Sequence, residues 1–186
     1  MLDRFKKESF PFLQNLRPDT DFDWLSIAQH YGLPTRLLDW TGNALAALWF
    51  AVASDPGPGV TEGVVWVLEV EPKNEKKPSR NESPFELNRT YIFQPFHIDR
   101  RIAAQVGWFS IHRYSEERGK FYALDNIKLY KPNIQRYPVP IAAFDKLRAE
   151  LRLVGVTQAT IFPDLAGLCA EIQADCLGTF RATPTI

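Results

Sequence analysis

The first element predicted by the pattern of apolar and polar residues is an amphipathic helix that begins near Asp21. Its apolar side chains follow one helical face with the spacing i, i+3, i+4 and i+7: Trp24, Ile27, Ala28 and Tyr31. Asp21 or Asp23 is suited to the N-cap, and Gly32 followed by Pro34 predicts the end of the helix. Residues 37–40 follow, and we expect them to form a short buried strand.

Two long apolar runs come next. Residues 44–53 are apolar at almost every position, so we expect a helix that is buried on nearly all sides. Residues 63–70 contain a second continuous apolar run, which is typical of a central strand. Residues 71–82 are charged and contain proline, which predicts a long loop.

The rest of the chain predicts shorter elements of both kinds. We expect strands or extended segments at residues 91–96, 108–114, 127–130 and 159–162. We expect helices at residues 99–104, from about Ile141 to Gly155, and from Asp164 to Gly178. Strands and helices are mixed without strict βαβ alternation. The order therefore predicts one α+β domain over residues 1–186, with a mixed or split β-sheet and packed helices.

The composition narrows the choice of protein class. The 186 residues are 45% hydrophobic and 13% aromatic, which is enough to fill one core. Lys and Arg together number 22, as do Asp and Glu, so no basic surplus indicates a nucleic-acid partner. No apolar run reaches membrane-spanning length and no signal peptide is apparent, so we expect no membrane partner and a cytoplasmic location. Cys and His residues lack zinc-ligand spacing, so we expect no metal site.

Polar side chains of unlike chemistry gather between the two helical patterns. They are His30, Thr35, Arg36, Asp39, Thr41 and Asn43. Polar groups held between rigid elements are the usual construction of a small-molecule site. The alternative is that they cap the two helices and bond one another. The sequence signatures of serine hydrolases, P-loop proteins, dinucleotide-binding folds and zinc proteases are absent.

Three stretches resemble the FRG domain family of bacterial and phage proteins. They are A-Q-H-Y-G-L-P-T-R-L-L-D-W-T-G-N-A-L-A-A-L-W-F-A at residues 28–51, R-I-A-A-Q-V-G-W-F-S-I-H at residues 101–112, and G-V-T-Q-A-T-I-F-P-D-L-A-G-L at residues 155–168. The family is named for an F-R-G-Q type motif near its start, and no such motif occurs before Asp21. The resemblance implies a single FRG-like domain over residues 1–186 that lacks the family's first strand.

A more distant resemblance is to ADP-ribosyltransferases. Many of these enzymes carry an Arg or His on a first strand, a strand ending in Ser or Thr before a helix of small residues, and a third strand with Glu or Gln. Residues 38–41 with 47–51 resemble the second feature, and residues 105–109 resemble the third. The resemblance implies an ADP-ribosyltransferase-like fold with NAD as its substrate. Without the F-R-G-Q arginine, we expect weak binding and slow turnover of NAD.

On this interpretation Gln105 and Thr41 are the catalytic residues. Cleavage of NAD at a glycosidic bond develops positive charge on the ribose, and a side chain bonded to a ribose hydroxyl stabilises that charge. Gln105 could supply such a hydrogen bond, while Thr41 and Asn43 could hold a ribose or an amide. The structural alternatives are a helix-end cap for Gln105 and N-capping for Thr41 and Asn43.

Three other residues could bind rings or line the site. Tyr31 or Trp40 could stack on a nicotinamide or adenine ring, and the alternative for both is packing in the core. His30 could line the site or could be a hydrogen-bonded structural histidine.

Two arginines could bind phosphate. Arg36 could bind it through two parallel hydrogen bonds, or could form a buried ion pair with Asp39, which is otherwise a candidate for nucleotide binding. Arg101 has the same two possibilities, with the region of Asp99 as its partner in the protein.

Two functional classes follow from these residues. The first is a domain that binds NAD or another small-molecule nucleotide and is related to ADP-ribosyltransferases, in the setting of a toxin or a phage-defence effector. The second is a non-catalytic domain that binds a ligand, a protein or a nucleic acid on the same scaffold. Convergence of Arg36, Thr41 and Gln105 on one cleft would favour nucleotide chemistry. Exposed aromatic side chains beside residues 30–43 would favour a macromolecular partner.

Overall fold

The fold is seen in a computed structural model, which describes residues 1–13, 16–95, 100–117 and 119–177. The helices are α1 (Leu2–Ser9), α2 (Asp21–His30), α3 (Ala44–Val52), α4 (Arg100–Ala104), α5 (Phe144–Leu153), α6 (Gln158–Ile161) and α7 (Leu165–Leu177). The strands are β1 (Leu37–Thr41), β2 (Glu62–Leu68), β3 (Tyr91–Phe93), β4 (Gly107–Ile111), β5 (Tyr114–Ser115), β6 (Lys120–Phe121) and β7 (Ile134–Pro140). Short 3-10 helices lie at Phe10–Phe12, Pro72–Asn74, Leu124–Asn126, Lys131–Asn133 and Ile141–Ala143.

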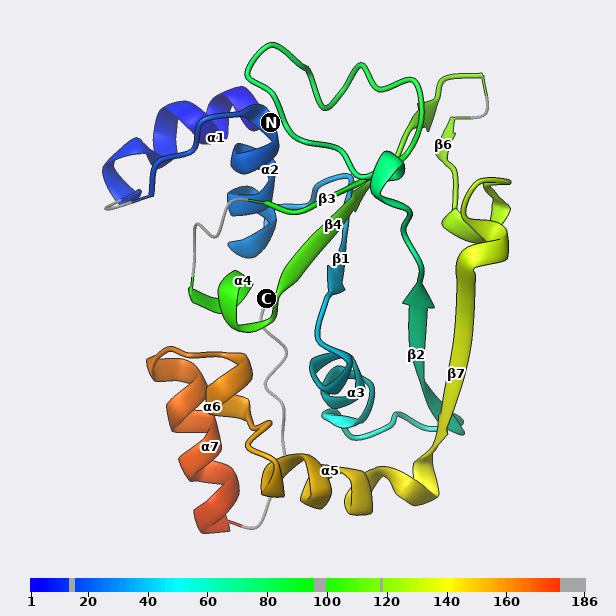
Figure 1. Ribbon diagram of the computed structural model, residues 1–186. Helices are drawn as coiled ribbons and strands as arrows, with labels where there is room; N and C mark the ends of the chain where they lie inside the picture. Colours follow the sequence, from blue (N-terminus) through cyan, green and yellow to red (C-terminus); the bar gives the residue numbers. More distant parts are fainter. Residues whose placement is uncertain (14–15, 96–99, 118, 178–186) are drawn as a thin grey trace.

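The described strands form separate small antiparallel sheets (Figure 1). The largest has the order β1-β4-β3, and Thr41 at the end of β1 lies opposite Gly107 at the start of β4. β2 pairs with β7 along its whole length, from Glu62 opposite Pro140 onward, and β5 pairs with β6. The α+β class and the split sheet expected from the sequence are confirmed. The expected strands of residues 37–40 and 108–114 contribute neighbouring strands to one sheet.

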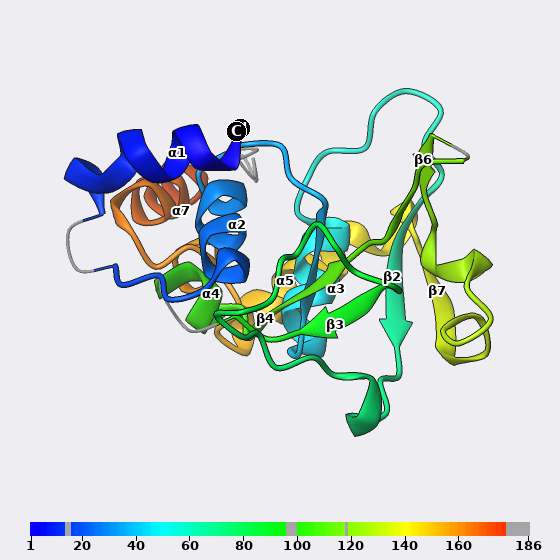
Figure 2. The ribbon, with the colours of Figure 1, turned by 90° about the horizontal axis from the view of Figure 1, so that it is seen from above.

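Helices α1, α2, α4 and α7 lie on the opposite side of the β1-β4-β3 sheet from the β2–β7 pair. Figures 1 and 2 show α1, α2, α4 and α7 to one side and β2 with β7 to the other, with α5 running between the two sides. One apolar cluster joins α1 and α2 to β3 and β4 and includes Phe22, Phe93 and Phe109. A second joins α3, α5 and α6 and includes Trp49 and Phe144. The two clusters fix the elements that carry the polar segment of residues 30–43.

The N-cap of α2 is not one of the two residues expected from the sequence. Thr20, rather than Asp21 or Asp23, is the N-cap, and its hydroxyl accepts the Asp23 main-chain N–H at 3.2 Å. The Asp23 carboxylate in turn accepts the Thr20 N–H at 2.8 Å, so the two residues form a capping box. The expected end of α2 is confirmed, because Gly32 has the left-handed φ of 84°.

Three segments are less buried than their apolar sequences predict. β1 is exposed at Leu38 and Asp39, so the expectation of a buried strand is wrong. Among the described residues, β2 pairs with β7 only, so it is not a central strand. α3 is not buried on nearly all sides, since Leu45 and Phe50 are exposed. Side chains of all three elements line the same cleft, which leaves part of each accessible to solvent.

In the last third of the chain, several elements differ from those expected from the sequence. Residues 127–130 form turns rather than a strand, and the extended segment expected at residues 159–162 is mostly helix α6. β7 has no counterpart among the expected strands. It tolerates Pro138 and Pro140 because, among the described residues, it pairs with β2 alone and its other edge is unpaired.

The expected ends of the last two long helices are confirmed where they are described. Gly155 follows α5 with a left-handed φ of 80°, and the Asp164 carboxylate accepts the Gly167 N–H at 2.9 Å at the start of α7. Three residues of the expected elements, Phe96, Asp99 and Gly178, lie outside the described residues.

Two kinds of feature are absent from the described residues. None of their helices is both long and apolar enough to cross a lipid bilayer. Within the same residues, no group of three or more His, Cys, Asp or Glu side chains is placed to hold a metal ion.

Candidate functional site

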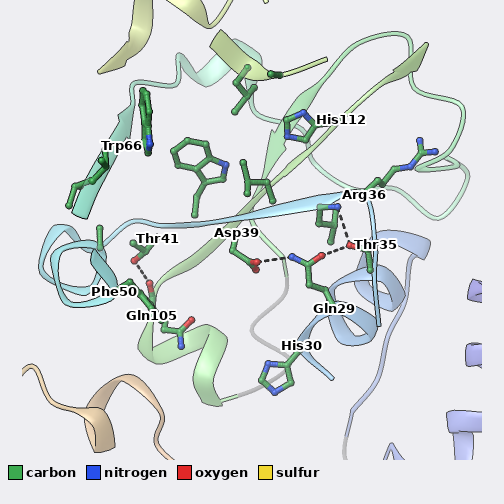
Figure 3. A pocket seen from close by; sticks show the side chains of 18 of the residues that line it. Gln29, His30, Thr35, Arg36, Asp39, Thr41, Phe50, Trp66, Gln105 and His112 are labelled. Atoms are coloured by element: carbon green, nitrogen blue, oxygen red, sulfur yellow. Dashed lines mark hydrogen bonds between the residues drawn. The ribbon is translucent and has the colours of Figure 1, made fainter. Parts of the chain in front are cut away.

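A cleft of about 1250 Å³ lies where β1, α3, β2 and α4 meet. Its volume exceeds the roughly 300–1,000 Å³ that small-molecule sites usually have, so a ligand could occupy part of it. Figure 3 shows that side chains of α2, β1, α3, β2 and α4 project into it. It lies at the junction of several rigid elements, which is a favourable place to hold a ligand.

The cleft contains most of the residues proposed from the sequence. The lining includes His30, Arg36, Asp39, Trp40, Thr41, Arg101 and Gln105. Arg36, Thr41 and Gln105 all line the cleft, but the Arg36 side chain points away from the other two in Figure 3, so the expected convergence of the three side chains is not seen. Tyr31 and Asn43 are not part of this lining. The Tyr31 side chain is 63% exposed and its ring meets His30 edge-on, so neither the stacking role nor core packing fits it.

Thr41 and Asn43 organise the start of α3. The Asn43 carboxamide oxygen accepts the main-chain N–H groups of Leu45 at 3.0 Å and Ala46 at 3.4 Å, so Asn43 is the N-cap. Thr41 Oγ1 accepts the Asn43 N–H at 3.0 Å and donates to the main-chain carbonyl of Gln105. Of the two residues, Asn43 therefore has the capping role given as the structural alternative. The Thr41 hydroxyl instead connects the end of β1 to the residue that follows α4.

The Gln105 side chain makes one structural bond. Its amide nitrogen donates to the Ile161 carbonyl oxygen at the end of α6, over 3.1 Å. Figure 3 shows its carboxamide next to Thr41, below β1. Since the nitrogen is engaged, the amide oxygen is the atom with which Gln105 can accept a hydrogen bond from a ligand.

The expected ion pair between Asp39 and Arg36 is wrong. Asp39 instead accepts a hydrogen bond from Gln29 Nε2 at 2.7 Å, and its side chain is exposed in the cleft. The two side chains point away from one another in Figure 3. Residues three apart along an extended chain face opposite sides, and this geometry separates the two charges.

Protein atoms surround the Asp39 carboxylate although solvent still reaches it. Desolvation raises the pKa of this carboxyl above its ordinary value, while the hydrogen bond from Gln29 and the charge of His30 act in the opposite direction. An exposed residue in a cleft with a raised pKa is a candidate for binding or proton transfer.

Arg36 is held by aromatic rings. Its guanidinium lies over the Phe85 ring at 4.8 Å and over the Phe121 ring at 5.5 Å, and Nη1 donates to the Pro84 carbonyl at 3.2 Å. Desolvation lowers the pKa of this guanidinium. Within the described residues, no carboxylate forms a salt bridge with Arg36, so the protein leaves much of its charge uncompensated.

Arg101 does have an acidic partner. It forms a salt bridge with Asp164 at the start of α7, and its guanidinium lies 5.3 Å from the Phe162 ring centroid. The hydrogen bond from Arg101 lowers the pKa of the Asp164 carboxyl. Arg101 thus links α4 to α7 in the wall of the cleft, and the expected partner near Asp99 lies outside the described residues. A role in phosphate binding fits Arg36 better than Arg101.

A directed chain of hydrogen bonds fixes Trp40 in the cleft wall. The Trp40 indole N–H donates to Ser110 Oγ at 3.0 Å, and Ser110 Oγ lies 2.9 Å from His112 Nε2. His112 Nδ1 lies 2.9 Å from the Tyr122 carbonyl oxygen, which can only accept. Nδ1 must therefore carry a proton, and in the neutral imidazole Ser110 donates to Nε2. Each polar atom of this chain then has one defined role.

Residues 1–57 match the FRG domain family. The resemblance read from the sequence is therefore confirmed over this segment. It contains α1, α2, β1 and α3, and with them Gln29, Arg36, Asp39 and Thr41. Comparisons with curated proteins and with solved structures found no match.

Two aromatic residues of the cleft are not predicted from the sequence. They are Trp66 of β2 and Phe121 of β6. His112 does line the cleft, as expected from the period of two that places Ser110 and His112 on one face of residues 108–112. Trp66 gave no such signal, because it stands within an apolar run that resembles a buried strand.

Replacing Asp39 by Asn tests whether the carboxylate supports the fold. A raised native pKa means that the native state binds the proton more tightly than the unfolded state, so ionised Asp39 lowers stability at neutral pH. Asn retains an oxygen that can accept from Gln29 without the charge. We expect the Asp39→Asn variant to be at least as stable as wild type at pH 7. The difference should shrink as the pH falls through the raised pKa, as measured by urea unfolding between pH 4 and pH 8.

A clear loss of stability for Asp39→Asn at pH 7 would show that the negative charge has a structural partner. The same titration on Asp164→Asn provides a contrast with the opposite sign. Arg101 lowers the pKa of Asp164, so its ionised form favours the native state, and that contribution is lost as the pH falls through the lowered pKa.

Proposed function

We propose that the cleft binds a nucleotide, with NAD as the substrate, and that Arg36 binds its phosphate. The observation that carries the proposal is the setting of Arg36. Arg36 lies at the edge of the cleft, two aromatic rings hold its guanidinium in place, and desolvation lowers its pKa without a compensating carboxylate among the described residues. A phosphate would supply the missing charge and accept two parallel hydrogen bonds from the fork of the guanidinium.

Aromatic side chains in the same cleft could bind the rings of the nucleotide. Trp40 lines the cleft with its indole N–H fixed on Ser110, and Trp66 and Phe50 are exposed within it. A flat ring that is already fixed loses little entropy when a base stacks on it. Arg36 and these rings therefore suit the two ends of a nucleotide.

The proposed chemistry is hydrolysis of NAD at the nicotinamide glycosidic bond: a water oxygen bonds to the ribose anomeric carbon, and nicotinamide leaves with the electron pair of the broken bond. The ribose becomes positively charged as this bond breaks, and a hydrogen bond from its hydroxyl to the Gln105 amide oxygen would strengthen in the transition state. Gln105 carries no negative charge, so this stabilisation is modest and turnover should be slow. A protein of this kind could deplete NAD or modify a macromolecule, which suits a toxin or a phage-defence effector.

Calorimetric titration with NAD tests the proposal through Arg36. We expect Arg36→Gln to weaken NAD binding by about 10- to 100-fold, the effect of losing a charge-assisted pair of hydrogen bonds. Arg89→Gln is the matched control, because the Arg89 guanidinium also lies over an aromatic ring, that of Tyr91 at 4.8 Å, but does not line the cleft. Unchanged affinity in Arg36→Gln would exclude Arg36 as the phosphate site.

Release of nicotinamide distinguishes an enzyme from a binding domain. Slow release that depends on Gln105 would support the catalytic reading. NAD binding without release would favour a non-catalytic ligand-binding domain on the same scaffold. Absence of NAD binding at millimolar concentration would leave the exposed aromatics of the cleft as a surface for a protein or nucleic-acid partner, and would overturn the proposal.

A further inference from the structure

Gln29 and Thr35 hold the Asp39 carboxylate from one side. The Leu37 main-chain N–H donates to Thr35 Oγ1 at 3.0 Å, and the Thr35 hydroxyl donates to Gln29 Oε1. Gln29 Nε2 then donates to Asp39 Oδ2 at 2.7 Å. Because Leu37 can only donate, every bond in this row has a fixed direction. The row is visible at the centre of Figure 3.

This arrangement leaves Asp39 ready to accept further hydrogen bonds. An ionised carboxylate offers about four lone-pair positions, and Gln29 occupies one of them. The Asp39 main-chain N–H also bonds the carboxylate, and because Asp39 is exposed and lines the cleft, the other positions are accessible. The fixed Gln29 amide prevents the carboxylate from turning freely, which prepares it for a ligand with a defined geometry.

We propose that the Asp39 carboxylate binds the paired hydroxyl groups of a ribose in the bound nucleotide. This inference rests on the proposed function above and adds the sugar to it. A carboxylate only accepts hydrogen bonds, and two neighbouring hydroxyls are donors that match its two oxygens. Asp39, Gln29 and Thr35 form a site for the sugar that is distinct from the phosphate site at Arg36.

The position of Arg36 favours a nucleotide over a smaller ligand. Arg36 and Asp39 are three residues apart, so their Cα atoms are separated by at most about 11 Å. Their side chains diverge, as Figure 3 shows, and only an extended ligand can contact both. The ligand must offer an anion at one end and hydrogen-bond donors at the other. A phosphate and a ribose, joined in one nucleotide, meet both conditions.

Desolvation supports the same assignment. Surrounding protein raises the pKa of the Asp39 carboxyl, which indicates that its ionised form is incompletely hydrated in the free protein. Hydroxyl groups of a ligand would replace the missing water and stabilise the charge. Binding should therefore favour the ionised form of Asp39.

The test compares NAD with two analogues that each lack the 2′-hydroxyl of one ribose. Calorimetry on wild type is expected to show at least a tenfold weaker affinity for one of the analogues than for NAD. In Asp39→Asn this discrimination should fall to less than threefold, because the acceptor has lost its charge. Asp125→Asn is the matched control, since Asp125 also lines the cleft, and it should discriminate as wild type does.

A second pair of variants tests the supporting row. Thr35→Val removes the hydroxyl that fixes Gln29 and should reduce the discrimination at least threefold, whereas Thr35→Ser should restore it. The ribose site would be overturned if wild type bound NAD and both analogues with equal affinity, or if Asp39→Asn discriminated between them as strongly as wild type does. Either result would leave the proposed function standing. Failure of wild type to bind NAD at all would overturn both.

Discussion

Trp49→Ala is expected to lower the free energy of unfolding by about 4 kcal/mol, the usual effect of removing a large aromatic side chain from a core. Trp49 is 1% exposed and belongs to the cluster that joins α3, α5 and α6. Its ring packs edge-on against Phe162 at 5.8 Å. The cavity left by alanine would lie beneath the wall of the cleft, so nucleotide binding should weaken as well. Urea unfolding at pH 7 measures the stability.

The Trp49→Phe variant separates the effect of losing the apolar ring from the effect of losing the indole N–H. The indole nitrogen of Trp49 is buried and has no hydrogen-bond partner among the described residues. An unpartnered buried donor destabilises the native state by about 1–3 kcal/mol, and phenylalanine removes it while keeping most of the apolar area. We expect Trp49→Phe to be destabilised far less than Trp49→Ala. Equal losses in the two variants would show that the indole N–H does contribute a bond.

The sequence was sufficient to predict the helices with strong boundary signals. α2 has apolar spacing on one face and a glycine at its end, and α7 has Asp164 at its start, so both were placed closely. These signals are local: a cap or a left-handed glycine depends on neighbouring residues and little on the rest of the fold.

Burial was harder to predict, because it depends on which elements are neighbours. The apolar runs at α3 and β2 suggested complete burial, but Phe50 and Trp66 face the cleft. Nothing in a linear pattern distinguishes an apolar side chain that lines a cleft from one in a core. β7 depends on its neighbours in the same way, since its prolines are tolerated because one edge of the strand is unpaired in the part of the chain that the structure describes.

The candidate site was predicted in position but not in its contacts. The polar segment of residues 30–43 does form one side of the cleft. The predicted partner of Asp39 is wrong, because the prediction chose the opposite charge nearest in the sequence, Arg36. The actual partner, Gln29, comes from α2 and is brought to Asp39 by the packing of α2 beside β1. Val106 has a left-handed φ of 48°, which no sequence rule predicts for a β-branched residue.

Gly167→Ala is expected to destabilise the protein by about 1–3 kcal/mol, the range for overpacking a tight contact. Alanine usually stabilises a helix relative to glycine, by about 1 kcal/mol, so the ordinary effect in α7 would have the opposite sign. Here a Cβ on Gly167 would overlap the carbonyl oxygen of Phe162 and lie 2.8 Å from its Cβ. Backbone atoms cannot rotate away as a flexible side chain can, so α7 or the segment at Phe162 must move.

The movement should reach the cleft, because Phe162 lines it and packs against Trp49 and Arg101. We therefore expect Gly167→Ala to weaken NAD binding along with stability. Gly57→Ala is the matched control: a Cβ there meets no atom within 4 Å, so this variant should unfold like wild type. Thermal unfolding of the two variants measures the difference. A Gly167→Ala variant as stable as Gly57→Ala would mean that α7 can shift away from Phe162 without loss, and that the close approach of the two does not determine the shape of the cleft.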